Sequence, residues 1–104
     1  MGTIVAFRPL EHPSEWTSQV DAADALLQTA LKAVAAGRSG EARALLRRAV
    51  VADLRRAEPW YWLGALHEQT QDIPRAAQAY YMALELGRSV PAREALLRLG
   101  LIRG

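Results

Sequence analysis

Apolar residues recur three and four positions apart along most of this 104-residue chain, from about Asp21 to its end. No stretch alternates between apolar and polar residues as a half-exposed strand would, and β-branched residues are few, so the pattern indicates helices throughout. The pattern is interrupted at four places, and the predicted helices cover residues 21–36, 40–56, 59–70, 73–86 and 90–99.

The interruptions carry residues that end or begin helices. Gly37 can take the left-handed backbone conformation that closes a helix, and Ser39 can cap the amide groups of the next one. Pro59 is tolerated in the first turn of a helix, and Asp72 is expected to cap the helix that contains Pro74. Because the connectors are short, consecutive helices are expected to lie antiparallel, which predicts an all-α run of helical hairpins.

A pattern of small and large residues recurs after 34 positions in the second helix of each predicted hairpin. It reads Ala42, Leu46 and Ala49 in the first unit, and Ala76, Tyr80 and Ala83 in the second. A period of this length is typical of helical repeat proteins, in which stacked hairpins share a continuous core.

The second unit resembles the tetratricopeptide repeat family. The residues that carry the resemblance are Trp60, Leu63, Gly64, Ala76, Tyr80 and Ala83. Large rings at Trp60 and Tyr80 would fill the space between helices, and the small Gly64 would let two backbones approach closely. The sequence departs from the family pattern at His67, where a tyrosine is usual, and at Arg88, where a proline is usual.

The resemblance implies two repeats, over residues 23–56 and 57–90, stacked as a short right-handed α-solenoid of about five helices. The first repeat matches less well, since Leu26, Thr29 and Ala30 stand in place of Trp and Leu-Gly. Residues 96–100 resemble residues 60–64 again, so a capping helix is expected over about residues 90–102. Residues 1–20 form a leader outside the repeats, either disordered or docked on the domain or on a neighbouring copy.

The resemblance also implies a concave groove lined by the first helix of each hairpin. The expected groove residues are Leu27, Leu31, Val34, Tyr61, Ala65 and Glu68. Family members that hold acidic peptide tails carry lysine and asparagine at the positions of Leu27 and Leu31, so that use is not expected. The apolar composition favours an apolar or amphipathic peptide, and a foreign protein, a second copy of the chain and the leader all stay open as occupants.

The formal net charge of +2 comes from residues 1–56, of which eight are basic and six are acidic. A possible basic patch on the second helix comprises Arg43, Arg47, Arg48, Arg55 and Arg56. It could bind nucleic acid or an anionic membrane, but a solvated outer face is the favoured interpretation, because no aromatic residues interleave with the arginines.

No arrangement of residues predicts catalysis. The chain has no cysteine, its carboxylates are scattered, and it contains no glycine-rich phosphate loop. His67 and Glu68 begin like a zinc-protease motif, but Gln71 stands where the second histidine must be, so His67 is expected to fill a packing position. The sequence therefore predicts a protein without enzymatic activity, metal or cofactor.

Taken together, these features predict a protein–protein interaction module, such as an adaptor, a chaperone-like protein or an assembly factor. The alternatives are a homo-oligomeric structural scaffold, with a homodimer as its simplest form, and the nucleic-acid or membrane binder described above. The first apolar stretch is too short for a secretory signal, and no window holds the roughly 20 apolar residues of a membrane span, so a cytoplasmic protein is expected.

Overall fold

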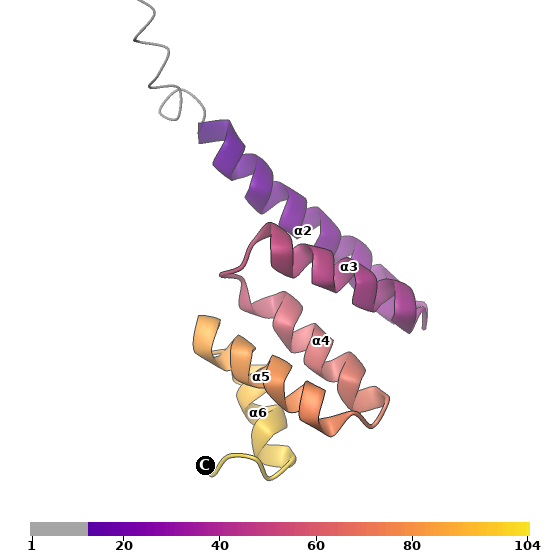
Figure 1. Ribbon diagram of the computed structural model, residues 1–104, viewed down its shortest axis with the longest axis vertical. Coiled ribbons are helices and arrows are strands. Elements are labelled where there is room, and N and C mark those ends of the chain that lie inside the picture. The colour runs from indigo at the N-terminus through magenta and orange to yellow at the C-terminus, as the bar shows by residue number, and fades with distance from the viewer. Residues whose placement is uncertain (1–12) are drawn as a thin grey trace, which may run out of the picture.

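The computed structural model describes residues 13–104 of the chain, with side chains from Asp21 onward. Within these residues it contains five helices and no strand (Figure 1). The helices are α2 (Pro13–Ala35), α3 (Ser39–Ala52), α4 (Ala57–Gln69), α5 (Ile73–Gly87) and α6 (Val90–Arg98). The leader expected over residues 1–20 lies outside the described residues up to position 12, and residues 13–20 form the start of α2.

Two helix boundaries differ from the predicted ones by four residues or more, and the others agree within two residues. Helix α2 begins at Pro13 rather than Asp21, and proline suits the first position of a helix because its missing N–H would have no partner there. Helix α3 ends at Ala52 rather than Arg56. The reason is Asp53, which has an extended backbone and whose Oδ1 accepts a hydrogen bond of 3.1 Å from the N–H of Arg55, so the side chain forms a turn in place of another helical turn.

The helix caps are those predicted at two of three positions. Gly37 has a φ of 77°, the left-handed conformation expected after α2, and Oδ1 of Asp72 accepts a hydrogen bond of 3.3 Å from the N–H of Arg75 at the start of α5. The prediction for Ser39 is wrong. The N-cap of α3 is Arg38, whose side chain makes no capping hydrogen bond, and Ser39 is already helical.

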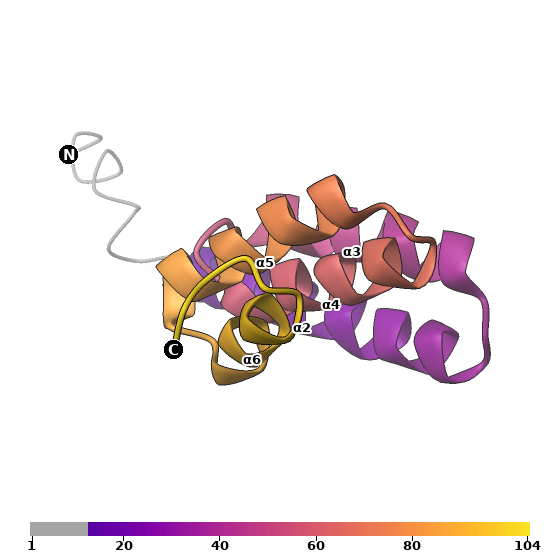
Figure 2. The ribbon, with the colours of Figure 1, turned by 90° about the horizontal axis from the view of Figure 1, so that it is seen from below.

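Neighbouring helices pack antiparallel, which confirms the predicted all-α arrangement of hairpins. The most extensive contacts lie within the pairs α2–α3 and α4–α5, and contacts of α3 with α4 and of α5 with α6 join these pairs into one array. Figures 1 and 2 show α3 and α5 on one side of the array, and α2, α4 and α6 on the other. The first helix of each hairpin therefore lies on the same side as α6.

Two hydrophobic clusters fill the interior. The first joins α2, α3 and α4 with one residue of α5, and the second joins α5 and α6. All six residues of the 34-residue pattern are at most 1% exposed. Trp60 is half-buried and packs against both clusters, so one side chain connects the two clusters.

The tight crossing of α4 and α5 occurs at Gly64. A Cβ atom built on Gly64 would lie 2.6 Å from Cδ1 of Tyr80, which is closer than side-chain carbons approach one another. The expected close approach is therefore confirmed, and Tyr80, 1% exposed, occupies the space that a side chain at Gly64 would need.

Residues 96–100 resemble residues 60–64 in sequence, but the glycines that end the two blocks differ in their structural role. Gly64 lies inside α4, whereas Gly100 follows the end of α6 and has a φ of 74°. This left-handed conformation is readily available to glycine and ends the helix. Leu96 nevertheless lies in the second hydrophobic cluster, fully buried.

Candidate functional site

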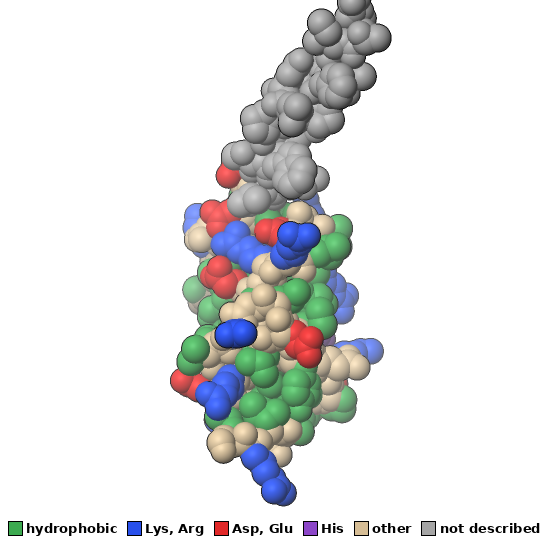
Figure 3. All heavy atoms as spheres, turned by 90° about the vertical axis from the view of Figure 1, so that its left-hand side faces the viewer, with side chains coloured by type: hydrophobic (Ala, Val, Ile, Leu, Met, Phe, Trp, Pro, Cys, Tyr) green, Lys and Arg blue, Asp and Glu red, His purple; other side chains and the backbone are tan. Residues whose placement is uncertain are grey.

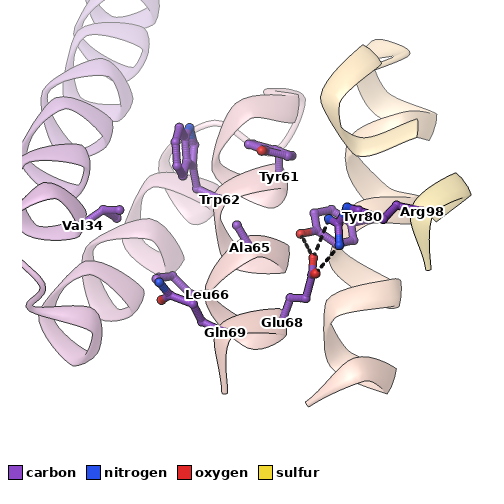
Figure 4. A pocket seen from close by; sticks show the side chains of 9 residues that line it. All are labelled: Val34, Tyr61, Trp62, Ala65, Leu66, Glu68, Gln69, Tyr80 and Arg98. Carbon is purple, nitrogen blue, oxygen red and sulfur yellow. Dashed lines mark hydrogen bonds and ion pairs between the residues drawn. The ribbon is translucent and has the colours of Figure 1, made fainter. Parts of the chain in front are cut away.

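A hollow of about 320 Å³ lies on the side of the array formed by α2, α4 and α6, and we call it the inner groove (Figure 4). Helix α4 supplies most of its lining, with single residues from α2, α5 and α6. The lining residues are Val34, Tyr61, Trp62, Ala65, Leu66, Glu68, Gln69, Tyr80 and Arg98.

Four of the six expected groove residues meet in this hollow: Val34, Tyr61, Ala65 and Glu68. Leu27 does not line it. That side chain is 1% exposed within the first hydrophobic cluster, because α2 packs along α3 and turns Leu27 into the hairpin interior. Leu31, partly buried, packs against the same cluster and also lies outside the hollow.

One side of the inner groove is aromatic. The rings of Tyr61 and Trp62 meet edge to face, with centroids 5.2 Å apart and planes at 71°. The centroid of the Tyr61 ring also lies 5.8 Å from the centroid of the Tyr80 ring. Edge-to-face contact fixes the orientation of aromatic rings, so this side presents a preformed apolar surface.

The other side of the groove is polar, and of its residues the sequence predicted only Glu68. The carboxylate of Glu68 accepts a hydrogen bond of 2.7 Å from the hydroxyl of Tyr80. Both terminal nitrogens of Arg98 donate to the same carboxylate, at 2.5 Å and 3.0 Å, and form a fork (Figure 4). The cluster of Glu68, Tyr80 and Arg98 thus connects α4, α5 and α6.

The hydrogen bonds in this cluster shift the pKa values of Glu68 and Tyr80 in opposite directions. The hydrogen bonds from Arg98 are the main cause that lowers the pKa of Glu68, against the opposing effect of burial, and the bond from Tyr80 acts in the same direction. Burial, followed by the hydrogen bond to Glu68, raises the pKa of Tyr80, so its hydroxyl keeps its proton and donates. The expectation of an apolar groove therefore holds for only one side.

The possible basic patch divides into two parts. Arg43, Arg47 and Arg48 lie on α3, but Arg55 and Arg56 follow its end at Ala52. On the face that Figure 3 draws, acidic, basic and hydrophobic side chains are interspersed rather than segregated.

Arg56 has a structural role. One of its nitrogens donates to Asp24 at 2.8 Å and to Glu58 at 3.2 Å, which ties α2 to the start of α4. Burial would lower the pKa of Arg56, but the hydrogen bonds to Asp24 and Glu58 outweigh that effect and raise it. Arg56 is therefore engaged with two carboxylates and is not free for an anionic ligand.

His67 is 8% exposed and lies in α4, consistent with a packing position. Burial is the main cause that lowers its pKa, and Arg43, Arg47 and Arg75 act in the same direction against Asp72. Within the described residues, no three side chains of histidine, aspartate or glutamate come together in a way that could hold a metal ion.

Over residues 13–104, these features define a five-helix, all-α domain of sequential antiparallel hairpins with a half-apolar, half-polar groove. The sequence matches no model of a known protein family and no curated protein sequence. None of the helices in residues 13–104 is long and apolar enough to cross a bilayer.

Proposed function

We propose that this chain is a tetratricopeptide-like interaction module that binds a peptide segment of another protein in its inner groove, without catalysis. The repeat assignment is supported by the 34-residue pattern, whose six members are all buried, and by the close packing of Gly64 against Tyr80. Both features follow from stacked hairpins of equal length.

The observation that carries the proposal is the composition of the inner groove. Its aromatic side, with Tyr61 and Trp62, offers apolar contact area, and its polar side places Glu68 and Arg98 in reach of a ligand. A hollow with a few polar groups on one side suits an amphipathic peptide, which gains affinity from apolar burial and orientation from the polar contacts.

Ala65 provides a direct test, because it lines the groove and is only half-buried. A displayed library of random peptides is selected on the immobilised wild-type chain, and the affinity of enriched peptides is measured for Ala65→Arg. An arginine side chain at this position would fill the hollow, so the affinity should fall by roughly tenfold or more.

The matched control is Ala25→Arg, the same substitution at an exposed position of α2 that lines none of the hollows described here. This variant should bind the selected peptides as the wild type does, and circular dichroism should show both variants folded. Equal affinity of the wild type and Ala65→Arg would exclude the inner groove as the binding site. A wild-type dimer that Ala65→Arg converts to a monomer would instead support the homo-oligomeric scaffold.

A further inference from the structure

Two further hollows flank helix α3 on the side opposite the inner groove. The first, of about 340 Å³, lies between α3 and α5 over α4, and the second, of about 390 Å³, lies between α2 and α3. Arg47 and Val51 line both hollows, so the two meet on the surface of α3. We call this surface the outer face.

The outer face offers apolar contacts at two depths. Val50, Leu63 and Ala79 line the first hollow and are at most 8% exposed, so they form a closed apolar floor. Val51, which lines both hollows, is 76% exposed. An exposed apolar residue beside a hollow with an apolar floor is a common feature of interaction surfaces.

The charged residues of α3 on this face are basic. Arg43, Arg47 and Arg48 have no carboxylate within 4.0 Å among the residues whose side chains are described, and Glu41, the acidic residue of α3, is paired with Arg38.

On the opposite wall, Arg75 of α5 lines the first hollow and forms an exposed ion pair with Asp72 at 3.3 Å. His67, between the two walls, has a lowered pKa and is neutral at physiological pH. The hollow is therefore bordered by arginines on both sides.

We propose that the outer face binds an acidic amphipathic segment of a partner protein, with an apolar side chain in the first hollow and carboxylates on Arg47 and Arg75. The hollows favour a peptide over nucleic acid or a membrane, because phosphates would leave the apolar floor unused and a bilayer cannot enter a concave site. This proposal does not depend on the inner groove, which lies on the other side of the array.

The probe is a fluorescent peptide of about 16 residues, long enough for four or five helical turns, with leucines on one face and glutamates on the other. The control peptide has the same sequence with glutamine in place of every glutamate. The acidic peptide should bind the wild-type chain more tightly than the glutamine peptide, and its affinity should fall as salt is added.

Two variants test the outer face. Arg47→Glu should lower the affinity for the acidic peptide by roughly tenfold or more, because it reverses the charge shared by both hollows. Val51→Asp should lower it as well, since the added carboxylate repels the peptide and removes an apolar contact. Arg93→Glu, at an exposed arginine of α6, is the matched control and should change the affinity by less than about twofold.

Equal binding of the acidic and glutamine peptides, or of Arg47→Glu and the wild type, would overturn the proposal. Tighter Arg47-dependent binding to duplex DNA or to phosphatidylserine vesicles than to the peptide would assign the face to phosphates instead. Arg47-dependent dimers in light scattering, without peptide binding, would assign it to a second copy of the chain.

Discussion

At Gly64 the packing leaves no room for a side chain. Replacing it with alanine places a methyl group 2.6 Å from the ring of Tyr80, which is buried, so the ring or the two helices must shift. We expect Gly64→Ala to lower the free energy of unfolding by about 1–3 kcal/mol, measured by urea denaturation.

Gly40 is the matched control for this substitution. It lies in the first turn of α3, and a Cβ atom there would meet nothing within 4 Å. Gly40→Ala should therefore stabilise the protein slightly, by about 0.5 kcal/mol, because alanine loses less backbone freedom in a helix. A stable Gly64→Ala variant would mean that α4 and α5 can separate at no cost.

His67 should make stability depend on pH. Its pKa is lowered in the folded state, so as the pH falls below about 6.5 the unfolded chain takes up the proton first and the free energy of unfolding decreases. Above that pH the histidine is neutral in both the folded and the unfolded state, so its titration does not change the free energy of unfolding. Urea denaturation at about pH 7.5 and 5.5 measures the loss before carboxylates titrate near pH 4.

His67→Gln removes this titration, so the loss of stability between the two pH values should become smaller. His12→Gln is the control, since His12 is the other histidine and lies outside the described residues. An unchanged pH dependence in His67→Gln would show that another group is responsible.

At the scale of elements, α6 is held to the second hairpin by the cluster of Glu68, Tyr80 and Arg98. Glu68→Gln keeps an acceptor for the hydroxyl of Tyr80 but loses the charged fork with Arg98. Amide hydrogen exchange should therefore become faster in α6 (Val90–Arg98) and stay unchanged in α2 and α3. Glu85→Gln, at an exposed glutamate of α5 without an ion pair in the described residues, should leave the exchange of α6 as it is.

The elements themselves were predictable because each boundary depends on nearby residues. Gly37 and Asp72 act through their own backbone and side-chain chemistry, and both were predicted correctly. The end of α3 was predicted too late, since the apolar pattern continues past Ala52 and the turn at Asp53 depends on one side-chain hydrogen bond. Sequence periodicity does not reveal which of two local hydrogen-bonding arrangements prevails.

At the scale of the whole molecule, the two hairpins share the first hydrophobic cluster, and the ring of Trp60 connects that cluster with the second one. Trp60→Ala should lower the free energy of unfolding by about 3 kcal/mol and weaken the coupling between the two clusters. Hydrogen exchange should then show different opening free energies for α2–α3 and α4–α5. Val90→Ala, at a residue 63% exposed, should change stability by less than about 0.5 kcal/mol.

The candidate site was predictable only in part. Val34, Tyr61, Ala65 and Glu68 were expected in the groove and line it. Leu27 was also expected there but is buried, since apolar residues on one helix face serve either a groove or a core and the sequence does not distinguish them.

By itself, the sequence determined the class of fold, the hairpin order and the 34-residue register, because helix periodicity, caps and repeat spacing are local or periodic properties of the chain. Only the tertiary structure decided that Arg98 pairs with Glu68, 30 positions away in the sequence, and that Arg47 and Arg75 line the same hollow. Such meetings depend on how far each helix is rotated and where it ends, which are set by the packing of the whole array.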